Sequence, residues 1–212
     1  MKKIVMVTTA AFLLLFLVYQ GSMAFFHAET QVGANISAGS LGIELVQDSQ
    51  DEKAVKTEDG IQIASVMPGD EIDSSAYIKN VKDHTLYVRV TATKYWEDAI
   101  GTKLPDADAS LITLNTKDTK NWIIKDDAEN SNSENVYFYY RLPIKANEIS
   151  TNLMDAIKIS SKLSDETYHD YRIALTLEVD AVQSISGTDA VLSEWGADIE
   201  LDADGNILSV DD

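Results

Sequence analysis

The chain has 212 residues, of which 45% are hydrophobic and 25% charged, a composition typical of a folded protein with a hydrophobic core. Thirty-five Asp and Glu residues stand against 17 Lys and Arg, so the formal net charge of -18 excludes binding to nucleic acid or to an anionic lipid surface. The lack of cysteine excludes disulfides, thiolate zinc sites, iron–sulfur clusters and cysteine nucleophiles.

Residues 1–24 have the pattern of an export signal peptide. Two lysines precede an almost unbroken apolar run over residues 4–18, and a small-x-small motif ends at Ala24. We expect cleavage between Ala24 and Phe25; this removes two lysines and no acid, so the net charge changes from -18 to -20. The alternative is a retained membrane anchor, because apolar residues resume at Met23 and a spanning helix needs about 20 residues.

Alternation of apolar and polar residues dominates the chain from residue 35 onward, which predicts half-buried strands. The clearest strand is 85–96, where the even-numbered residues from Leu86 to Ala92 are apolar and face away from the odd-numbered ones. Further strands are expected within 36–45, 60–67, 72–78, 136–142 and 173–181.

These patterns predict an all-β fold, an antiparallel β-sandwich of jelly-roll-like type, in a single domain over residues 25–212. Two segments interrupt the strand pattern and are expected to be insertions, 98–120 and 147–164, the first with a short helix over 106–114. The polar stretch 126–135 is expected to be a solvated loop.

A short helix and a hairpin are expected at the C-terminus. Thr188 suits the N-cap of the helix and Gly196 its end. The final hairpin is expected to place Ile199 and Leu201 opposite Ile207 and Leu208.

No motif for enzymatic chemistry is found in the sequence. The three histidines, His27, His84 and His169, lie in separate segments and form no His-Glu-x-x-His pair, and there is no Gly-x-Ser-x-Gly nucleophile motif. We therefore expect no catalytic zinc site and no hydrolase activity.

The one candidate for a metal site is a weak calcium site at Asp202, Asp204 and Asn206, whose spacing matches the start of a calcium loop. A bidentate Glu at the twelfth loop position would fall beyond residue 212, so a plain Asp-Gly hairpin turn is the favoured alternative. No other cofactor is expected.

The segment 135–142 is rich in aromatic residues and offers two interpretations. With Trp122 and Trp195 it forms a set that suits a sugar-binding platform. Alternation instead places Phe138 and Tyr140 in the core, with Tyr137 and Tyr139 on the outer face or under an insertion, and this packing interpretation is favoured.

Two segments near the N-terminus have distinctive sequences: residues 24–30 read Ala-Phe-Phe-His-Ala-Glu-Thr, and residues 35–45 read Asn-Ile-Ser-Ala-Gly-Ser-Leu-Gly-Ile-Glu-Leu. They resemble the signal-peptide junction and first strand of the TasA/camelysin family of exported Gram-positive proteins. The Met-Pro-Gly-Asp turn at 67–70 and Tyr-Ile-Lys-Asn at 77–80 are similar to its Pro-Gly-Asp turn and following strand. Ser40 departs from the usual Thr, and the middle insertion has no counterpart.

The resemblance implies cleavage by a SipW-type signal peptidase and export of a jelly-roll-like sandwich to the cell surface or biofilm matrix. The best-known members assemble into fibres, so the resemblance implies that the partners of this chain are further copies of it or related matrix subunits. Other members carry a metallopeptidase label, for which this sequence has no zinc motif. After cleavage no membrane attachment is expected.

Our hypothesis from the sequence is a structural matrix subunit whose freed N-terminal segment adds as a strand to a neighbouring sandwich. The strand would run from Phe25 to Leu45, and burial in a partner would stabilise each large apolar side chain by about 1.5–3 kcal/mol. Its apolar residues are Phe25, Phe26, Ile36, Leu41, Ile43 and Leu45.

The alternatives are a surface adhesin that uses the outer aromatic face and, less favoured, a metallopeptidase. Repulsion between acidic subunits predicts that salt, calcium or lower pH favours assembly.

Overall fold

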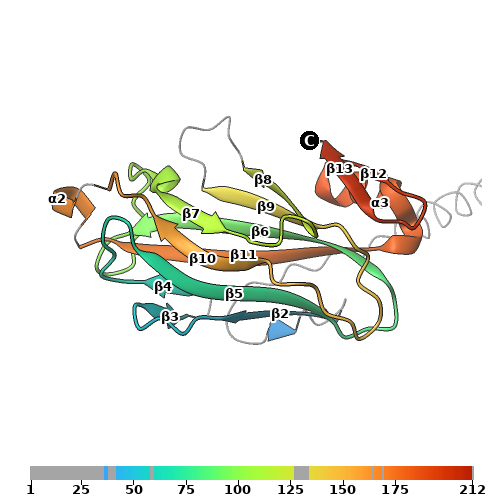
Figure 1. Cartoon of the computed structure of the whole chain (residues 1–212), viewed down its shortest axis with the longest axis horizontal. Coiled ribbons are helices and arrows are strands. Elements are labelled where there is room, and N and C mark those ends of the chain that lie inside the picture. Colours follow the sequence, from blue (N-terminus) through green and yellow to red (C-terminus); the bar gives the residue numbers. More distant parts are fainter. Residues whose placement is uncertain are drawn as a thin grey trace, which may run out of the picture.

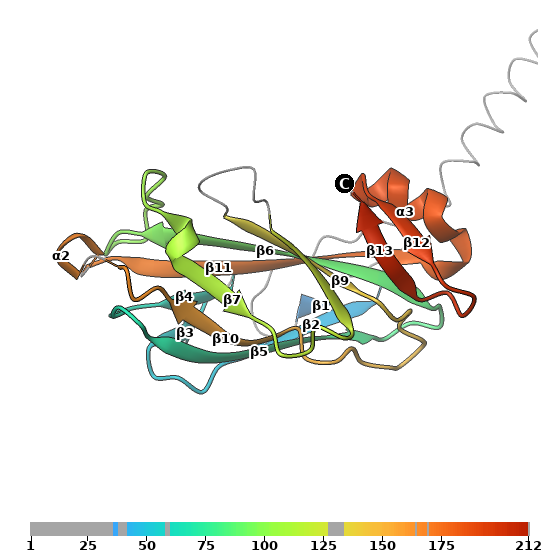
Figure 2. The same cartoon turned by 45° about the horizontal axis from the view of Figure 1, so that its top comes forward.

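The computed structural model describes residues 36–37, 42–57, 60–126, 134–163, 165–168 and 170–211, which form two packed antiparallel sheets (Figure 1). The expected all-β sandwich is confirmed. Figure 2 shows the two layers from a second angle, with a short helix and a hairpin against one end of the upper layer.

Sheet A has the strand order β1-β2-β5-β10-β7. Its strands are β1 (Ile36–Ser37), β2 (Ile43–Asp48), β5 (Glu71–Asn80), β10 (Met154–Ile159) and β7 (Ile112–Asn115). Burial alternates along β5, so one face of the sheet lies in the core and the other faces solvent. A bulge between Met154 and Ala156 interrupts the register of β10 with β5.

Sheet B has the strand order β3-β4-β11-β6-β9-β8. Its strands are β3 (Ala54–Lys56), β4 (Ile61–Ile63), β11 (Arg172–Gln183), β6 (Leu86–Glu97), β9 (Asn135–Tyr140) and β8 (Trp122–Asp126). The centre is the pair β6 and β11, which run antiparallel in unbroken register from Arg172↔Glu97 to Gln183↔Leu86. The two ends of this long ladder differ in what lies against their outer face.

The main core lies between the sheets and is built from the apolar positions that alternation predicts. In β6 the residues Leu86, Val88, Val90 and Ala92 are at most 2% exposed, as expected for the face that points inward. In β11 the odd-numbered residues 173–181 are buried in the same way. The period-two pattern therefore locates the inner face of both central strands correctly.

Successive strands or hairpins cross from one sheet to the other along the chain, as a jelly-roll-like sandwich requires. The segments expected as insertions take part in this alternation. Segment 98–120 contributes β7 and segment 147–164 contributes β10, which lies in the interior of sheet A between β5 and β7. They are thus parts of the sandwich and not additions to it. The sequence pattern misses β10 because Asp155 and Lys158 break its short apolar run.

The helical content is smaller than the patterns suggest. The helix expected over 106–114 is a single 3-10 turn, η2 (Ala109–Leu111), whose N-cap Asp108 accepts a hydrogen bond from the Ser110 amide. Ile112, the next residue, already begins β7. A one-turn helix, α2 (Asp165–Tyr168), precedes β11. The β-branched Ile112 and Thr113 favour the strand once sheet A offers a partner in β10.

The expected C-terminal helix and hairpin are present: after a 3-10 turn, η3 (Ser184–Ser186), come α3 (Gly187–Trp195), β12 (Asp198–Leu201) and β13 (Ile207–Asp211). Thr188, the expected N-cap, lies inside the helix, because the helix follows η3 directly and begins at Gly187. Gly196, with φ of 68°, ends the helix. A bulge between Glu200 and Leu201 places Ile199 opposite Val210, so the residue that packs inward is Val210 and the expected Leu208 is half exposed. We call α3, β12 and β13 the C-terminal unit.

The C-terminal unit covers the outer face of sheet B near the Leu86–Gln183 end of the β6/β11 ladder (Figure 2). Here a second hydrophobic core forms, separate from the main one. Sheet B contributes Tyr87, Tyr139 and Val182, and the C-terminal unit and the residue before β12 contribute Ala190, Val191, Trp195, Ala197, Ile199, Ile207 and Val210.

Candidate functional site

The edge of sheet A at β2 is where the predicted assembly strand enters the fold. On its inner side β2 pairs with β5 along its whole length, from Ile43 to Asp48. On its outer side only Glu44 and Leu45 have a partner among the described residues, the two-residue strand β1. Among the described residues no strand lies beside Val46 to Asp48 on this side, which makes β2 an edge strand of the described sheet.

The structure divides the predicted assembly strand at Ile43. Ile43 and Leu45 are 1% and 2% exposed and pack into the main core of their own sandwich. Removing them from that core to fill a neighbour would cost the subunit two large buried side chains. Ile36 lies in β1, paired with Leu45, while Ala24, Phe25, Phe26 and Leu41 lie outside the described residues. The part that is free to join a partner thus ends before Ile43.

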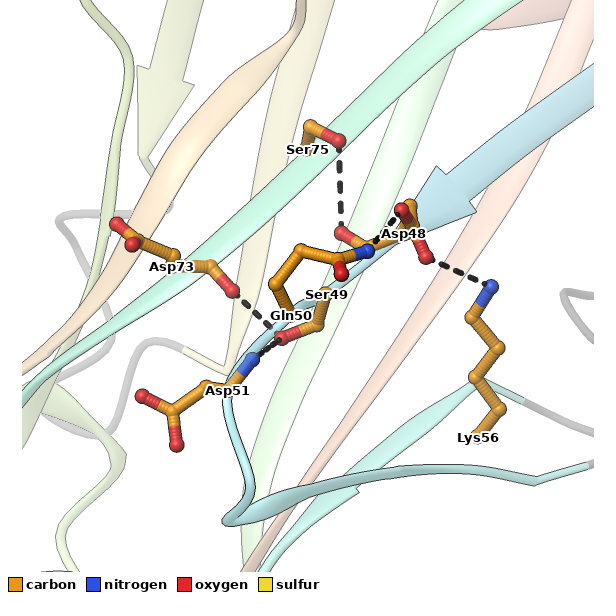
Figure 3. A network of polar contacts seen from close by, with 7 residues as sticks. All are labelled: Asp48, Ser49, Gln50, Asp51, Lys56, Asp73 and Ser75. Atoms are coloured by element: carbon orange, nitrogen blue, oxygen red, sulfur yellow. Dashed lines mark hydrogen bonds and ion pairs between the residues drawn. The ribbon is translucent and has the colours of Figure 1, made fainter.

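Polar contacts hold the far end of β2 against its neighbours (Figure 3). The Asp48 carboxylate accepts a hydrogen bond from the Gln50 side-chain amide (2.7 Å) and pairs with Lys56 of β3 (3.1 Å between Nζ and Oδ1). The bond with Lys56 is the main cause of a lowered pKa of Asp48. The Ser49 hydroxyl donates to the Asp73 carbonyl of β5 at 2.6 Å. The edge strand is therefore fixed in place at this end.

Two polar side chains lie inside the core close to this edge. Gln47 of β2 and Ser74 of β5 are 4% and 3% exposed, and neither the Gln47 amide nor the Ser74 hydroxyl has a hydrogen-bond partner among the described residues. Gln47 is opposite Ala76 in register, so the two side chains are diagonal neighbours on the inner face. Each unsatisfied group costs about 1–3 kcal/mol of stability.

The calcium candidate forms a hairpin turn between β12 and β13. The Asp202 carboxylate accepts hydrogen bonds from the backbone amides of Asp204 (2.9 Å) and Asn206 (2.8 Å) and from the Asn206 side-chain amide (2.9 Å). The bond from the Asn206 backbone is the largest cause of a lowered pKa of Asp202. Both Asp202 oxygens thus accept bonds from N–H donors within the turn, which is the geometry of the alternative hairpin-turn interpretation.

Two arginines of sheet B attach the C-terminal unit, and sequence reasoning did not identify them. Arg89 of β6 lies opposite Asp180 of β11, and its guanidinium donates to the Asp180 carboxylate (2.6 and 3.0 Å) and to the Trp195 carbonyl (2.9 Å). Arg141 donates to the carbonyls of Ile207 and Leu208. The sequence does place opposite charges at outward positions of two long strands, β6 and β11. Which of these charged residues lie opposite each other, however, depends on the register of the two strands.

The outer aromatic residues lie under the C-terminal unit. Tyr139 is 1% exposed and its ring lies 5.7 Å from that of Trp195, while Tyr137 is partly buried beside the Arg89 guanidinium. Phe138 and Tyr140 face the main core, as alternation predicts. Tyr139 is therefore a packing residue and is not available as a platform for a sugar.

Tyr87 links the sheet to the hairpin turn that holds Asp202. Its hydroxyl donates to the Gly205 carbonyl at 2.8 Å, and burial, with a contribution from the charge of Asp202, raises the pKa of Tyr87. The C-terminal unit is thus attached at its helix end by Arg89 and at its turn by Tyr87.

Comparison with protein-family models, with curated proteins and with solved structures found no match. In the described part of the chain no three His, Asp or Glu side chains lie close enough together to hold a metal ion. Among those same residues no helix has the length and apolar character needed to cross a membrane.

Proposed function

We propose that the chain is an exported structural subunit of a cell-surface or biofilm matrix, and that its N-terminal segment, residues 25–37, adds as a strand to the β2 edge of a neighbouring copy. In the single subunit the end of that segment, β1, pairs with its own β2. In the assembly the same edge takes the segment of the next subunit. Signal-peptide removal by a SipW-type peptidase frees the segment and so acts as the switch.

The observation that supports this proposal is the edge of β2. Strand addition derives its affinity from backbone hydrogen bonds along an exposed edge. Only Glu44 and Leu45 of the six residues of β2 have a described partner there, whereas the polar contacts of Asp48 and Ser49 hold the strand in position. An edge strand that is held at one end, and that has described outer partners at only two of its six residues, suits such an acceptor.

The first test is negative-stain microscopy with sizing of protein that starts at Phe25, with and without calcium and at pH 5 and 7. Filaments are expected, more of them with calcium or at lower pH, because subunits of net charge -20 repel one another. A stable monomer under every condition would contradict the proposal.

A second test locates the donor segment. Deleting residues 25–37 is expected to abolish assembly, and Phe25→Ser with Phe26→Ser to weaken it strongly. The matched control is Ile100→Ser, which removes an apolar side chain that is 87% exposed in a surface loop and is expected to leave assembly unchanged. If the deletion assembles as well as the intact chain, the N-terminal strand is not the connector.

A further inference from the structure

The outer face of sheet B carries a pocket at the end that the C-terminal unit leaves uncovered. It has a volume of about 190 Å³. Its floor consists of outward residues on three neighbouring strands, Gln62 of β4, Tyr95 and Glu97 of β6, and Ala174 and Thr176 of β11. Thr57 and Gly101, from the loops after β3 and β6, form two of its sides.

The backbone at Gly60, just before β4, lies directly against β11. A Cβ atom at Gly60, which has φ of 148°, would lie 2.1 Å from the Leu175 carbonyl oxygen. The Thr57 amide donates to the Gly60 carbonyl at 2.8 Å and closes the loop. On the other side, the Asp98 carboxylate accepts from the amides of Ile100 and Thr102 and shapes the loop that contains Gly101. Both sides of the pocket are thus built by local geometry.

The polar groups in the pocket are held in a fixed orientation. The Gln62 side-chain amide donates to the Glu97 carboxylate at 2.6 Å, and Arg172 donates to the Gln62 side-chain carbonyl at 3.3 Å. Glu97 and Arg172 are opposite each other in register, yet Gln62 lies between them and they form no direct ion pair. Arg172 is therefore a positioning residue, which orients the Gln62 amide toward Glu97.

This arrangement favours a ligand that offers several hydroxyl groups. Glu97 is 8% exposed, and its second carboxylate oxygen accepts no hydrogen bond within the described part of the protein, so it is an acceptor for a hydroxyl donor. The hydroxyls of Thr57 and Thr176 both donate and accept. Ala174 adds apolar surface, and the Tyr95 ring, which has the Lys103 ammonium 5.0 Å from its centroid, lines the pocket beside it. The negative charge of Glu97 and of the whole chain disfavours an anion.

We infer that this pocket binds a neutral saccharide unit, with Glu97 and Gln62 as the residues that contact its hydroxyls. The inference does not depend on assembly, because the pocket lies on sheet B and the β2 edge on sheet A. In a matrix subunit such a site would join the protein to neutral polysaccharide.

The test is a titration of ¹⁵N-labelled protein (residues 25–212) with glucose, galactose and N-acetylglucosamine, followed by NMR. Saturable shifts of the Gln62 side-chain amide and of the Tyr95 and Thr176 backbone amides are expected for at least one sugar, with half-saturation at about 1 mM or below. Gln62→Ala is expected to weaken binding at least tenfold. Gln50→Ala, a glutamine change in the segment after β2, is the matched control and is expected to leave it unchanged.

Two results would overturn the inference. One is that none of the sugars shifts these resonances at about 10 mM, ten times the expected half-saturation. The other is that calcium chloride or lysine shifts them and the sugars do not, which would make Glu97 a cation site. Because Gln62 is only partly buried, Gln62→Ala is expected to fold, and its spectrum checks this directly.

Discussion

The two ends of the β6/β11 ladder carry the same kinds of charge but use them differently. At one end Arg89 of β6 lies opposite Asp180 of β11, and the two form a direct ion pair with side chains 15% and 7% exposed. At the other end Arg172 of β11 lies opposite Glu97 of β6, and Gln62 separates them. The C-terminal unit covers the first end, whereas the second is open as a pocket.

The difference shows how the neighbours of a charged pair determine its role. Beside Arg89, the Trp195 carbonyl and ring complete the environment of the guanidinium, which then holds the C-terminal unit on the sheet. Beside Arg172, the third strand supplies an amide, and polar groups stay accessible through the pocket. The covered end contributes to stability and the open end is available for binding.

The largest effect is expected for Arg89→Met. The change leaves the buried Asp180 carboxylate without its guanidinium and should lower the free energy of unfolding by about 3–5 kcal/mol. Urea unfolding measures this loss in the free energy of unfolding. The control is Lys158→Met, which removes an exposed ion pair with Glu71 (3.3 Å) and is expected to cost about 1 kcal/mol or less. Equal losses in the two variants would show that the covered pair has no special role.

The inner side of β6 beneath the open end carries Lys94, which is 3% exposed and donates to the carbonyls of Ala109 (2.9 Å) and Ile112 (2.7 Å). Burial lowers the pKa of Lys94, while the charges of Asp126, Asp108 and Glu134 act in the opposite direction. The second bond joins sheet B to β7 of sheet A. Lys94 thus connects the two sheets through the core.

A lowered folded-state pKa means that the unfolded chain binds the Lys94 proton more tightly. The penalty for burying the charge is therefore present below the folded-state pKa and disappears as the pH rises toward the unfolded value of about 10.4. Stability of the wild type relative to Lys94→Met is expected to increase between pH 7 and 10.5, as measured by urea unfolding. A constant difference over this range would contradict the lowered pKa.

A smaller effect is expected for the open end. Gln62→Ala removes the amide between Glu97 and Arg172, but Gln62 is only partly buried and lines the pocket with Glu97, so the loss of stability should be about 1 kcal/mol or less. Thermal unfolding of Gln62→Ala, measured together with that of Arg89→Met, compares the two ends of the ladder directly. A loss as large as that of Arg89→Met would mean that the open end is as important for stability as the covered one.

The smallest effect is expected for Asp202→Ala in the hairpin turn of the C-terminal unit. A lowered pKa means that the contribution of Asp202 is present above its unfolded-state pKa of about 3.9 and is lost as the pH falls through the folded-state value. The variant should therefore unfold at a slightly lower temperature at pH 7 and match the wild type in strong acid. Calcium should shift both proteins equally; a shift in the wild type alone would restore the metal-site interpretation.

The strands with clear alternation followed from local pattern, whereas β3, β7, β8 and β10 and the strand order within the two sheets did not. Alternation over 85–96 and 173–181 identified β6 and β11 and the residues that face the core, because side chains on a strand alternate with a fixed period. The short strand β10 was not identified, since its burial depends on its place between β5 and β7. The candidate pocket was missed for the same reason: Gln62, Glu97 and Arg172 are 35 or more residues apart and meet only through register.

By itself the sequence determined the fold class, the C-terminal helix and hairpin, and the acidic charge of the chain, because each depends on composition or on contacts between near neighbours. The tertiary structure alone decided that Tyr139 is covered, that Ile43 and Leu45 belong to their own core, and that Arg89 holds the C-terminal unit. These results come from long-range pairing, in which the sheet order places distant residues side by side. Alternation of apolar and polar residues shows only which face of a strand a residue occupies. It does not show which residues pack against that face.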